Sequence, residues 1–243
     1  MFGGVKCGKI ERGKNHPSFP GFEKISAYSN GPKVWQPLSP FNLGPFSVTE
    51  KYNPYDQFEN NNQLGWKYFH NEQGHVQTIT VLSFERYWQG GKVYPNDLID
   101  PPQNFDHSVA TFNGKILGPS FYQRRVDILT NPNRDKKDIR HPLPKKKYGL
   151  PIQGFYSGEF VDYITSRKKY YCPSYRYFAF NTPTYQELLK KHQNGENLLI
   201  CGPDGLDTEI TEQNMRELIS NPKIIFGHEL VLCCMLSNLL VWE

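Results

Sequence analysis

The most apolar stretch of the chain, Leu230–Trp242, places the strongest constraint on its fold. A helix that crosses a bilayer needs about 20 apolar residues, and this stretch is shorter and is interrupted by Ser237 and Asn238. A helix that is apolar on every side is stable in water only when the rest of a domain encloses it. The stretch therefore predicts a buried terminal helix that begins around position 227 or 228, and no membrane span.

The length and composition of the chain predict a globular fold. With 243 residues the chain is long enough for one large domain, whereas two domains would each be small. Hydrophobic residues make up 37% of the chain and aromatic residues 14%, which supplies enough apolar surface for a core. We therefore expect a single globular domain over residues 1–243.

Local patterns predict a mixture of strands and helices. The segment His75–Val81 alternates in character and is rich in β-branched residues, as strands are. Ser83 is expected to be the N-cap of a short helix that Pro95 ends and that two glycines weaken. Further helices are expected over about 161–171, closed by Pro173, over 184–193, stopped by Gly195, and from Thr211 to about Ser220, with a short strand over 197–201.

The order of these elements predicts an α+β fold. The first 60 residues are rich in Gly, Pro, Asn and aromatic residues, so we expect loops and short strands wrapped on the surface. Helices dominate the second half, and strands do not alternate regularly with helices, so a doubly wound parallel sheet is not indicated. The prediction is a helix-rich α+β domain with a small sheet.

The cysteines indicate the compartment. The chain has five, an odd number without CxxC or CxxH spacing: Cys7, Cys172, Cys201, Cys233 and Cys234. The last two are adjacent in the apolar stretch, where reduced core thiols are expected. The spacing predicts neither a zinc site nor a disulfide framework. Because the first residues also lack the pattern of a secretory signal, we expect a reducing intracellular compartment such as the cytoplasm.

Positive charge is concentrated in one segment. The net charge is +4, and residues 134–147 (RDKKDIRHPLPKKK) carry most of the excess in a loop-like setting punctuated by prolines. A solvated surface loop is one interpretation. The alternative is a nucleic-acid contact through Lys145, Lys146 and Lys147, because clustered lysines bind the phosphate backbone.

One face of the helix predicted after Ser83 gathers four side chains of different chemistry. Positions three and four apart share a face of a helix, and the four are Glu85, Trp88, Gln89 and Lys92. Such a set suits a nucleoside-like ligand, because an indole stacks on a flat base, a carboxamide reads its edges and the two charged groups bind polar atoms. The alternative is an ordinary exposed helix face whose polar residues pair with one another.

A carboxylate on this face suits cleavage of a ribose N-glycosidic bond. Breaking that bond develops oxocarbenium character at the sugar, which a fixed carboxylate such as Glu85 stabilises. Lys92, when partly desolvated, acquires a lowered pKa and can act as a nucleophile or an acid. The chain has no GxGxxG, Walker, HExxH or GxSxG motif, which removes the motif-based assignment to most common enzyme classes. An N-glycosidase of this kind is expected to need no cofactor and no metal.

The segment Phe84–Pro95 (FERYWQGGKVYP) resembles the signature helix of the NADAR family, in which a glutamate, an aromatic residue, a glutamine and a lysine recur. Upstream, Leu38–Phe46 (LSPFNLGPF) is similar to the segment that precedes that helix. The resemblance implies a NADAR-like fold and an N-glycosidase of ADP-ribosyl or ribosyl-phosphate groups. In that reading Glu85 stabilises the ribose, Lys92 attacks or protonates near the anomeric carbon, and Trp88 packs on the base.

The same resemblance implies phosphate-binding residues. Arg124 or Arg125, and Arg167 or Lys168, would receive phosphate, since arginine suits bidentate contacts. The alternative is that these basic residues are simply solvated on an exposed helix face.

Three polar residues in the last third of the chain are further candidates for substrate binding. Asp204 and Asp207 lie in the turn GPDGLD after a strand, where loops often carry functional groups; turn chemistry explains them equally well. His228 opens the terminal helix, whose backbone amides can hold an anion. A purely structural histidine is the alternative there.

Three functions remain open at this point. The first is an N-glycosidase. The second is a non-catalytic module of the same fold that binds nucleotides or nucleic acid, and the third is a structural component of a larger assembly. An enzyme requires Glu85 and Lys92 to point into one concave pocket, whereas a nucleic-acid module requires the lysines at 145–147.

Overall fold

The computed structural model of the protein describes residues 2–10, 20–26, 33–53, 55–60, 63–68, 75–103, 105, 107, 109–141, 143 and 149–243. The chain forms two compact units. The first unit comprises Met1–Leu43 and Tyr163–Glu243, and the second comprises Gly44–Asp162. The single domain expected from the length of the chain stays a prediction.

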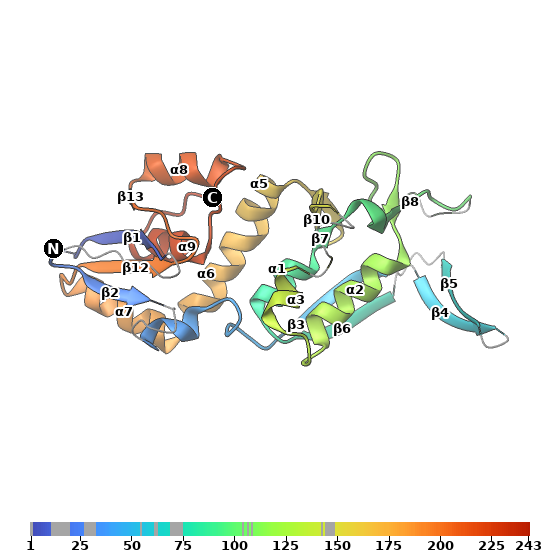
Figure 1. The fold of residues 1–243 in the computed structure, drawn as a ribbon, viewed down its shortest axis with the longest axis horizontal. Coiled ribbons are helices and arrows are strands. Elements are labelled where there is room, and N and C mark those ends of the chain that lie inside the picture. Colours follow the sequence, from blue (N-terminus) through green and yellow to red (C-terminus); the bar gives the residue numbers. More distant parts are fainter. Residues whose placement is uncertain are drawn as a thin grey trace. The chain divides into compact units, whose positions relative to one another are not determined.

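A four-stranded sheet with the order β13-β1-β12-β2 lies in the first unit (Figure 1). Strands β1 and β2 run parallel to β12, and β13 runs antiparallel to β1. The bounds are β1 (Val5–Lys9), β2 (Glu23–Ser26), β12 (Leu198–Gly202) and β13 (Thr208–Glu209). All five residues of β12 are buried, as expected of an apolar strand with a parallel neighbour on each side.

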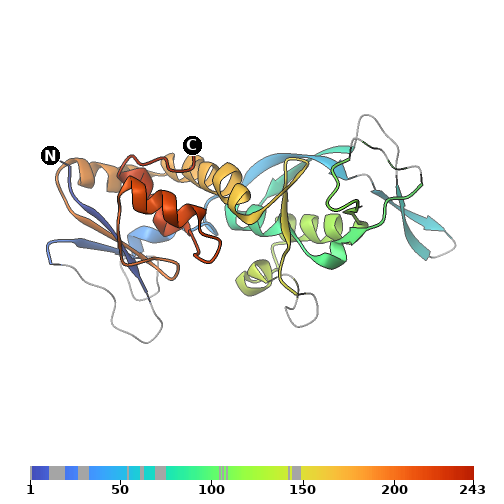
Figure 2. The same cartoon turned by 90° about the horizontal axis from the view of Figure 1, so that it is seen from above.

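Helix α9 (His228–Leu236) packs against β1 and β12 and also contacts α6 and α7 (Figure 2). All nine of its residues are buried, which confirms the prediction of a buried terminal helix. The other helices of this unit are η1 (Lys33–Leu38), α5 (Tyr163–Ser166), the π-helical turn η3 (Arg167–Tyr171), α6 (Cys172–Phe180), α7 (Pro183–Gln193) and α8 (Glu212–Ser220). Within the described ranges, no helix combines the length and the apolar character needed to cross a membrane.

The helix expected to close at Pro173 instead continues through it. The N–H of Cys172 donates to the carbonyl of Arg167, five residues earlier, so the chain makes a π-helical turn before α6 begins. Pro173 then occupies the first turn of α6, where an N–H has no intrahelical partner to lose. Proline therefore changes the type of helix here and does not end it.

Threonine side chains begin two of the helices in the first unit. Thr182 accepts a hydrogen bond from the N–H of Tyr185 at the start of α7, and Thr211 accepts one from the N–H of Asn214 at the start of α8. The helix predicted after Thr211 is confirmed. The helix expected from 184 begins one residue earlier, and Gly195, with φ of +90°, follows its end.

Helices α1 (Phe84–Gly90) and α2 (Pro119–Thr130) of the second unit pack on each other and on β6 (His75–Val81). Strand β6 pairs antiparallel with β3 (Phe46–Asn53). The remaining elements are β4 (Tyr55–Asn60), β5 (Gln63–Tyr68), β7 (Lys92–Val93), η2 (Pro95–Asp97), β8 (Leu98–Ile99), β9 (Ile116–Leu117), α3 (Lys136–Arg140), β10 (Gln153–Tyr156) and β11 (Glu159–Val161). The strand predicted at His75–Val81 is confirmed.

The helix predicted after Ser83 ends earlier than expected. It stops at Gly90, and Lys92 and Val93 form β7, which pairs with β10. Glycine has the lowest helix propensity of all residues except proline. In addition, a Cβ at Gly91 would overlap the ring of Tyr156. Lys92 therefore lies beyond the helix, which corrects the expectation that it shares a helical face with Glu85.

The described elements confirm an α+β fold with small sheets. The N-terminal segment differs from the surface wrap expected there, because β1 is paired on both sides within the sheet and Cys7 is only 1% exposed. All five cysteines are buried, and the structure shows no disulfide between them. Burial raises the pKa of the Cys234 thiol to about 12, so this thiol stays protonated near neutral pH.

Candidate functional site

The carboxylate of Glu85 lies in the first turn of α1 and is nearly buried, with 6% of the residue exposed. Its Oε1 atom accepts a hydrogen bond of 2.9 Å from Nε2 of Gln89, one helical turn later. The same oxygen lies 3.5 Å from Nε of Arg140. A buried carboxylate is costly unless hydrogen bonds and an opposite charge compensate it, and these two side chains provide that compensation.

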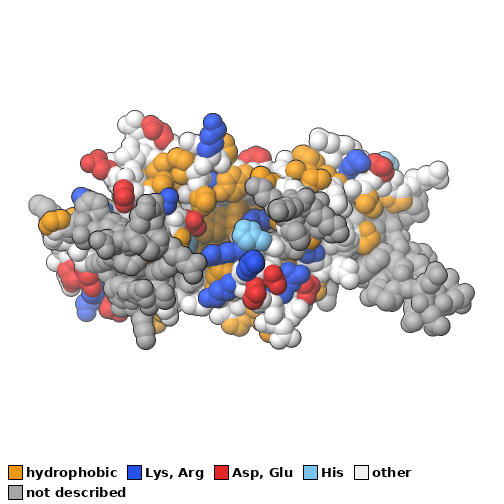
Figure 3. All heavy atoms as spheres, viewed as in Figure 1, with side chains coloured by type: hydrophobic (Ala, Val, Ile, Leu, Met, Phe, Trp, Pro, Cys, Tyr) orange, Lys and Arg blue, Asp and Glu red, His pale blue; other side chains and the backbone are white. Residues whose placement is uncertain are grey.

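Arg140 reaches this carboxylate from α3, which packs on α1. Asp135 begins α3 by accepting a hydrogen bond of 2.8 Å from the N–H of Asp138, and Ile139 is buried. The side chain of Arg140 is 53% exposed and thus extends from the buried carboxylate to the surface. Figure 3 shows Lys and Arg side chains gathered over this part of the second unit.

The charges of Glu85 and Arg140 both affect the pKa of Lys92. Burial lowers the pKa of its amine, the negative charge of Glu85 raises that pKa, and the positive charge of Arg140 lowers it again. The net direction is downward from the ordinary value. Although the helix does not carry Lys92 as predicted, the structure places it within the electrostatic influence of Glu85.

The backbone of Lys92 is fixed by Arg124. Arg124 donates a hydrogen bond of 2.9 Å to the carbonyl of Lys92 and forms a bidentate ion pair with Asp97, which is 2% exposed. The second oxygen of Asp97 also accepts from the N–H of Tyr94 at 2.7 Å. This placement differs from the phosphate contact expected of Arg124, because its guanidinium already binds a buried carboxylate.

Trp88 is held by Tyr156 of β10. The two rings stack with centroids 5.4 Å apart and an angle of 9° between their planes. The Tyr156 hydroxyl donates a hydrogen bond of 2.7 Å to the carbonyl of Trp88. Tyr156 thus positions the indole that was expected to pack on a base, and that expected role stays a prediction.

Three buried side-chain oxygens around α1 and the neighbouring strand β10 have no hydrogen-bond partner among the described residues. They belong to Ser83, Gln89 and Gln153. Ser83 stands at the N-cap position as predicted, but its hydroxyl makes no capping bond. Buried polar atoms are nearly always paired in folded proteins, so each exception calls for an explanation such as strain, a bound water or a catalytic role. Polar atoms of this kind are therefore present at the start and in the last turn of α1 and in β10.

Gln89 and Arg125 are more deeply placed than the sequence suggested. Gln89 is 8% exposed and donates a hydrogen bond to Glu85. It therefore positions the carboxylate, whereas the sequence suggested that it reads the edges of a base. Arg125 is 3% exposed, and its guanidinium lies 5.5 Å from the ring centre of Tyr87. Burial separates Arg125 from the surface at which a phosphate contact was expected.

Arg167, in the first unit, is enclosed by backbone carbonyls. It is 1% exposed and donates to the carbonyls of Leu218, Ile219, Asn221 and Ile224 at 2.7 to 3.4 Å. Its guanidinium also lies 4.4 Å from the ring centre of Tyr163. This arrangement joins η3 to the last turn of α8 and to the segment after it, and it differs from the phosphate contact expected of Arg167.

The remaining candidates of the first unit lie near the end of β12 or at the start of α9. Asp207 accepts a hydrogen bond of 3.3 Å from the N–H of Lys9, and Asp204 lies beside Gly227. His228 is nearly buried, and its Nδ1 atom is 3.3 Å from the fully buried carboxylate of Glu229. A Cβ at Gly202 would overlap that carboxylate, so the glycine is required by Glu229.

Sequence reasoning missed Arg140 and Tyr156. Arg140 was assigned to a basic loop, although the Asp135 that begins its helix is a recognisable N-cap residue. No signal in the sequence connects Tyr156 with Trp88, because they lie 68 residues apart. Lys145, Lys146 and Lys147 lie outside the described residues.

Among the described residues, no group of three or more His, Cys, Asp or Glu side chains is arranged to hold a metal ion. Comparisons of the chain with protein-family models, with curated proteins and with solved structures found no match. The candidate site therefore rests on the residues of the second unit and on their geometry.

Proposed function

We propose that the chain is an N-glycosidase that hydrolyses the N-glycosidic bond of an ADP-ribosyl or ribosyl-phosphate group. One observation carries this proposal: the buried Glu85 carboxylate is held by Gln89 and Arg140, and its charge acts on Lys92. A carboxylate fixed in this way stabilises the positive charge that develops on ribose when the bond to the base breaks. The resemblance of Phe84–Pro95 to the NADAR signature supports the same assignment.

The lowered pKa of Lys92 suits a role in the reaction. A lysine with a depressed pKa has a larger neutral fraction near pH 7, which lets its amine act as a nucleophile or exchange a proton. Overall, a water hydroxyl becomes bonded to the anomeric carbon and the base leaves with the proton. Glu85 would stabilise the sugar, and Gln89 would position Glu85.

Among the cations that the structure describes, we assign Arg140 to the phosphate of such a substrate. Its side chain is half exposed even while it pairs with the carboxylate of Glu85, whereas Arg124, Arg125 and Arg167 are largely buried. A guanidinium forms bidentate hydrogen bonds with phosphate oxygens. In this proposal Arg140 binds the phosphate, in place of the arginines that the sequence suggested.

A combined binding and turnover assay tests the proposed function. The purified chain is incubated with NAD, with ADP-ribose attached to a nucleobase and with ribosyl phosphates, and released base is measured by liquid chromatography. Thermal unfolding is followed with ADP-ribose, since a ligand at 100 times its dissociation constant stabilises the fold by about 2.7 kcal/mol. Stabilisation together with base release supports the glycosidase. Stabilisation with no release from any substrate contradicts it and favours a non-catalytic nucleotide-binding module.

A further inference from the structure

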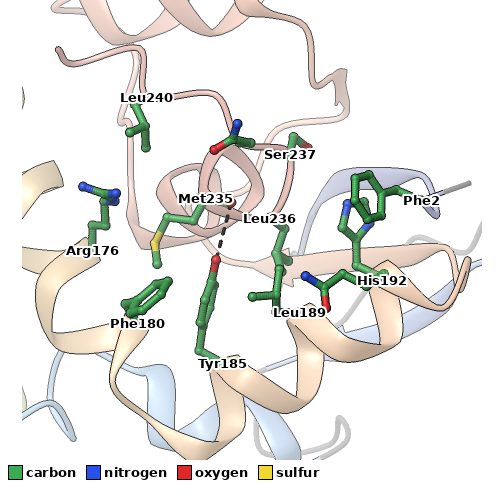
Figure 4. Close-up of a pocket in the computed structure, with 12 residues that line it drawn as sticks. Phe2, Arg176, Phe180, Tyr185, Leu189, His192, Met235, Leu236, Ser237 and Leu240 are labelled. Carbon is green, nitrogen blue, oxygen red and sulfur yellow. Dashed lines mark hydrogen bonds between the residues drawn. The ribbon is translucent and has the colours of Figure 1, made fainter.

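We propose that a cavity in the first unit binds a small organic molecule with an apolar body and a single carboxylate. The cavity has a volume of about 340 Å³ and is lined by residues of α6, α7 and α9 and of the segment after α9 (Figure 4). This volume is at the lower end of the range found for small-molecule sites. The Glu85 site is in the other unit, so the two proposals stand on different residues.

Apolar side chains form the larger part of the cavity wall, and Gln193, Ser237 and Asn238 add polar groups to it. Phe180, Leu189, Met235 and Leu240 contribute hydrophobic side chains, and Figure 4 shows them around the Tyr185 ring. Phe180 is 46% exposed. Burying such exposed apolar surface against a ligand is favourable, at about 25 cal/mol for each Å² removed from water. The body of the ligand is therefore apolar.

Arg176 is the only cationic residue of the cavity lining that the structure describes. One Nη atom lies 3.6 Å from the Glu243 carboxylate, which is beyond hydrogen-bond distance. The side chain is 44% exposed, so its guanidinium can be reached from solvent. A single guanidinium matches the planar geometry of one carboxylate and balances its single negative charge. The head group is therefore a carboxylate, which would take the place of Glu243.

His192 supplies a second polar feature of the lining. It is 7% exposed, and its Nδ1 atom has no hydrogen-bond partner among the described residues. Burial lowers the pKa of this imidazole, which favours its neutral form. Phe2 stacks on His192 with ring centroids 5.4 Å apart, and Phe2 is itself 68% exposed. Figure 4 shows this pair on the side of the cavity opposite Arg176.

The small volume and the separation of these polar groups decide between classes of partner. A helix or strand of another protein presents a surface larger than this cavity encloses. A small molecule, in contrast, spans from Arg176 across the apolar centre toward the polar groups of the far wall. We therefore assign the cavity to a small ligand and not to a protein partner.

The test compares an acid with its uncharged analogue on the full chain. Isothermal titration calorimetry measures the binding of 4-phenylbutyrate and of 4-phenylbutyramide to the parent and to Arg176→Gln, Arg216→Gln and Leu240→Trp. Arg216 lies on α8, is also half exposed and pairs with Glu212, so its substitution is a control for the same change in charge. Circular dichroism verifies that each variant is folded.

We expect saturable binding of the acid to the parent that is at least tenfold tighter than binding of the amide. Arg176→Gln should remove this difference, Arg216→Gln should preserve it, and Leu240→Trp should abolish binding of both compounds by filling the cavity. Equal affinities of the parent for acid and amide would overturn the assignment of the carboxylate. Absence of saturable binding of either compound to the folded parent would overturn the proposed site.

Discussion

The Nε atom of Arg140 lies 3.5 Å from the Oε1 atom of Glu85, so α3 supplies a cation to a carboxylate buried in α1. The carboxylate therefore has a partner on its own helix, Gln89, and one on a second helix. Lys92 is influenced by both charges, which act on its pKa in opposite directions. This balance is the basis of the first prediction.

Neutralising either charge should shift the pKa of Lys92, and the two shifts should have opposite signs. Glu85→Gln removes the charge that raises this pKa, so the pKa falls further. Arg140→Gln removes a charge that lowers it, so the pKa rises. Nuclear magnetic resonance of the Lys92 amine during a pH titration measures both shifts, with Arg216→Gln as the control. Shifts of the same sign would show that these charges do not act directly on Lys92.

Replacing Lys92 with Met should stabilise the fold near neutral pH. The pKa of Lys92 is lower in the folded chain than in the unfolded chain, so folding disfavours its protonated form and Lys92 destabilises the fold while protonated. That penalty is complete below the folded pKa and disappears as the pH rises through it toward the unfolded value of about 10.4. Urea unfolding at several pH values measures the effect. A stabilisation that grows with pH would contradict this account.

Replacing Arg167 with Met should destabilise the first unit by about 2 kcal/mol or more, because the carbonyls of Ile219 and Ile224, which lie in buried or partly buried surroundings, lose their guanidinium donor. Those carbonyls belong to the last turn of α8 and to the segment after it, which Arg167 joins to η3. The matched control is Lys168→Met, because Lys168 makes one exposed hydrogen bond to Ser220. Urea unfolding measures both variants. If both substitutions lowered the free energy of unfolding by the same small amount, the contacts of Arg167 would not stabilise the first unit.

Elements that depend on local chemistry were predictable from the sequence. The helix after Thr211 follows from its cap, and the buried terminal helix follows from the apolar run over residues 230–236. The start of α1 at Ser83 was also predicted. The end of α1 was not predicted. Lys92 lies three residues after Gln89, which is a helical spacing, but the helix ends at Gly90 and Lys92 belongs to β7.

Features that depend on distant contacts were not predictable. Strand β1 pairs with β12, whose residues lie far away in the sequence, so its burial has no local signal. The sequence also shows where arginines are but not what they bind. Arg124 and Arg167 were expected at a phosphate, and the structure engages them with Asp97 and with backbone carbonyls.

The measurement that tests the proposed function most directly is the rate of base release by Glu85→Gln. The variant keeps the size of the side chain and removes its charge, so the fold should persist while the rate falls by about 100-fold or more, since charge stabilisation of a transition state contributes on this scale. Glu217→Gln, at an exposed position on α8, should retain the parental rate. Base release by folded Glu85→Gln at the parental rate would contradict the glycosidase.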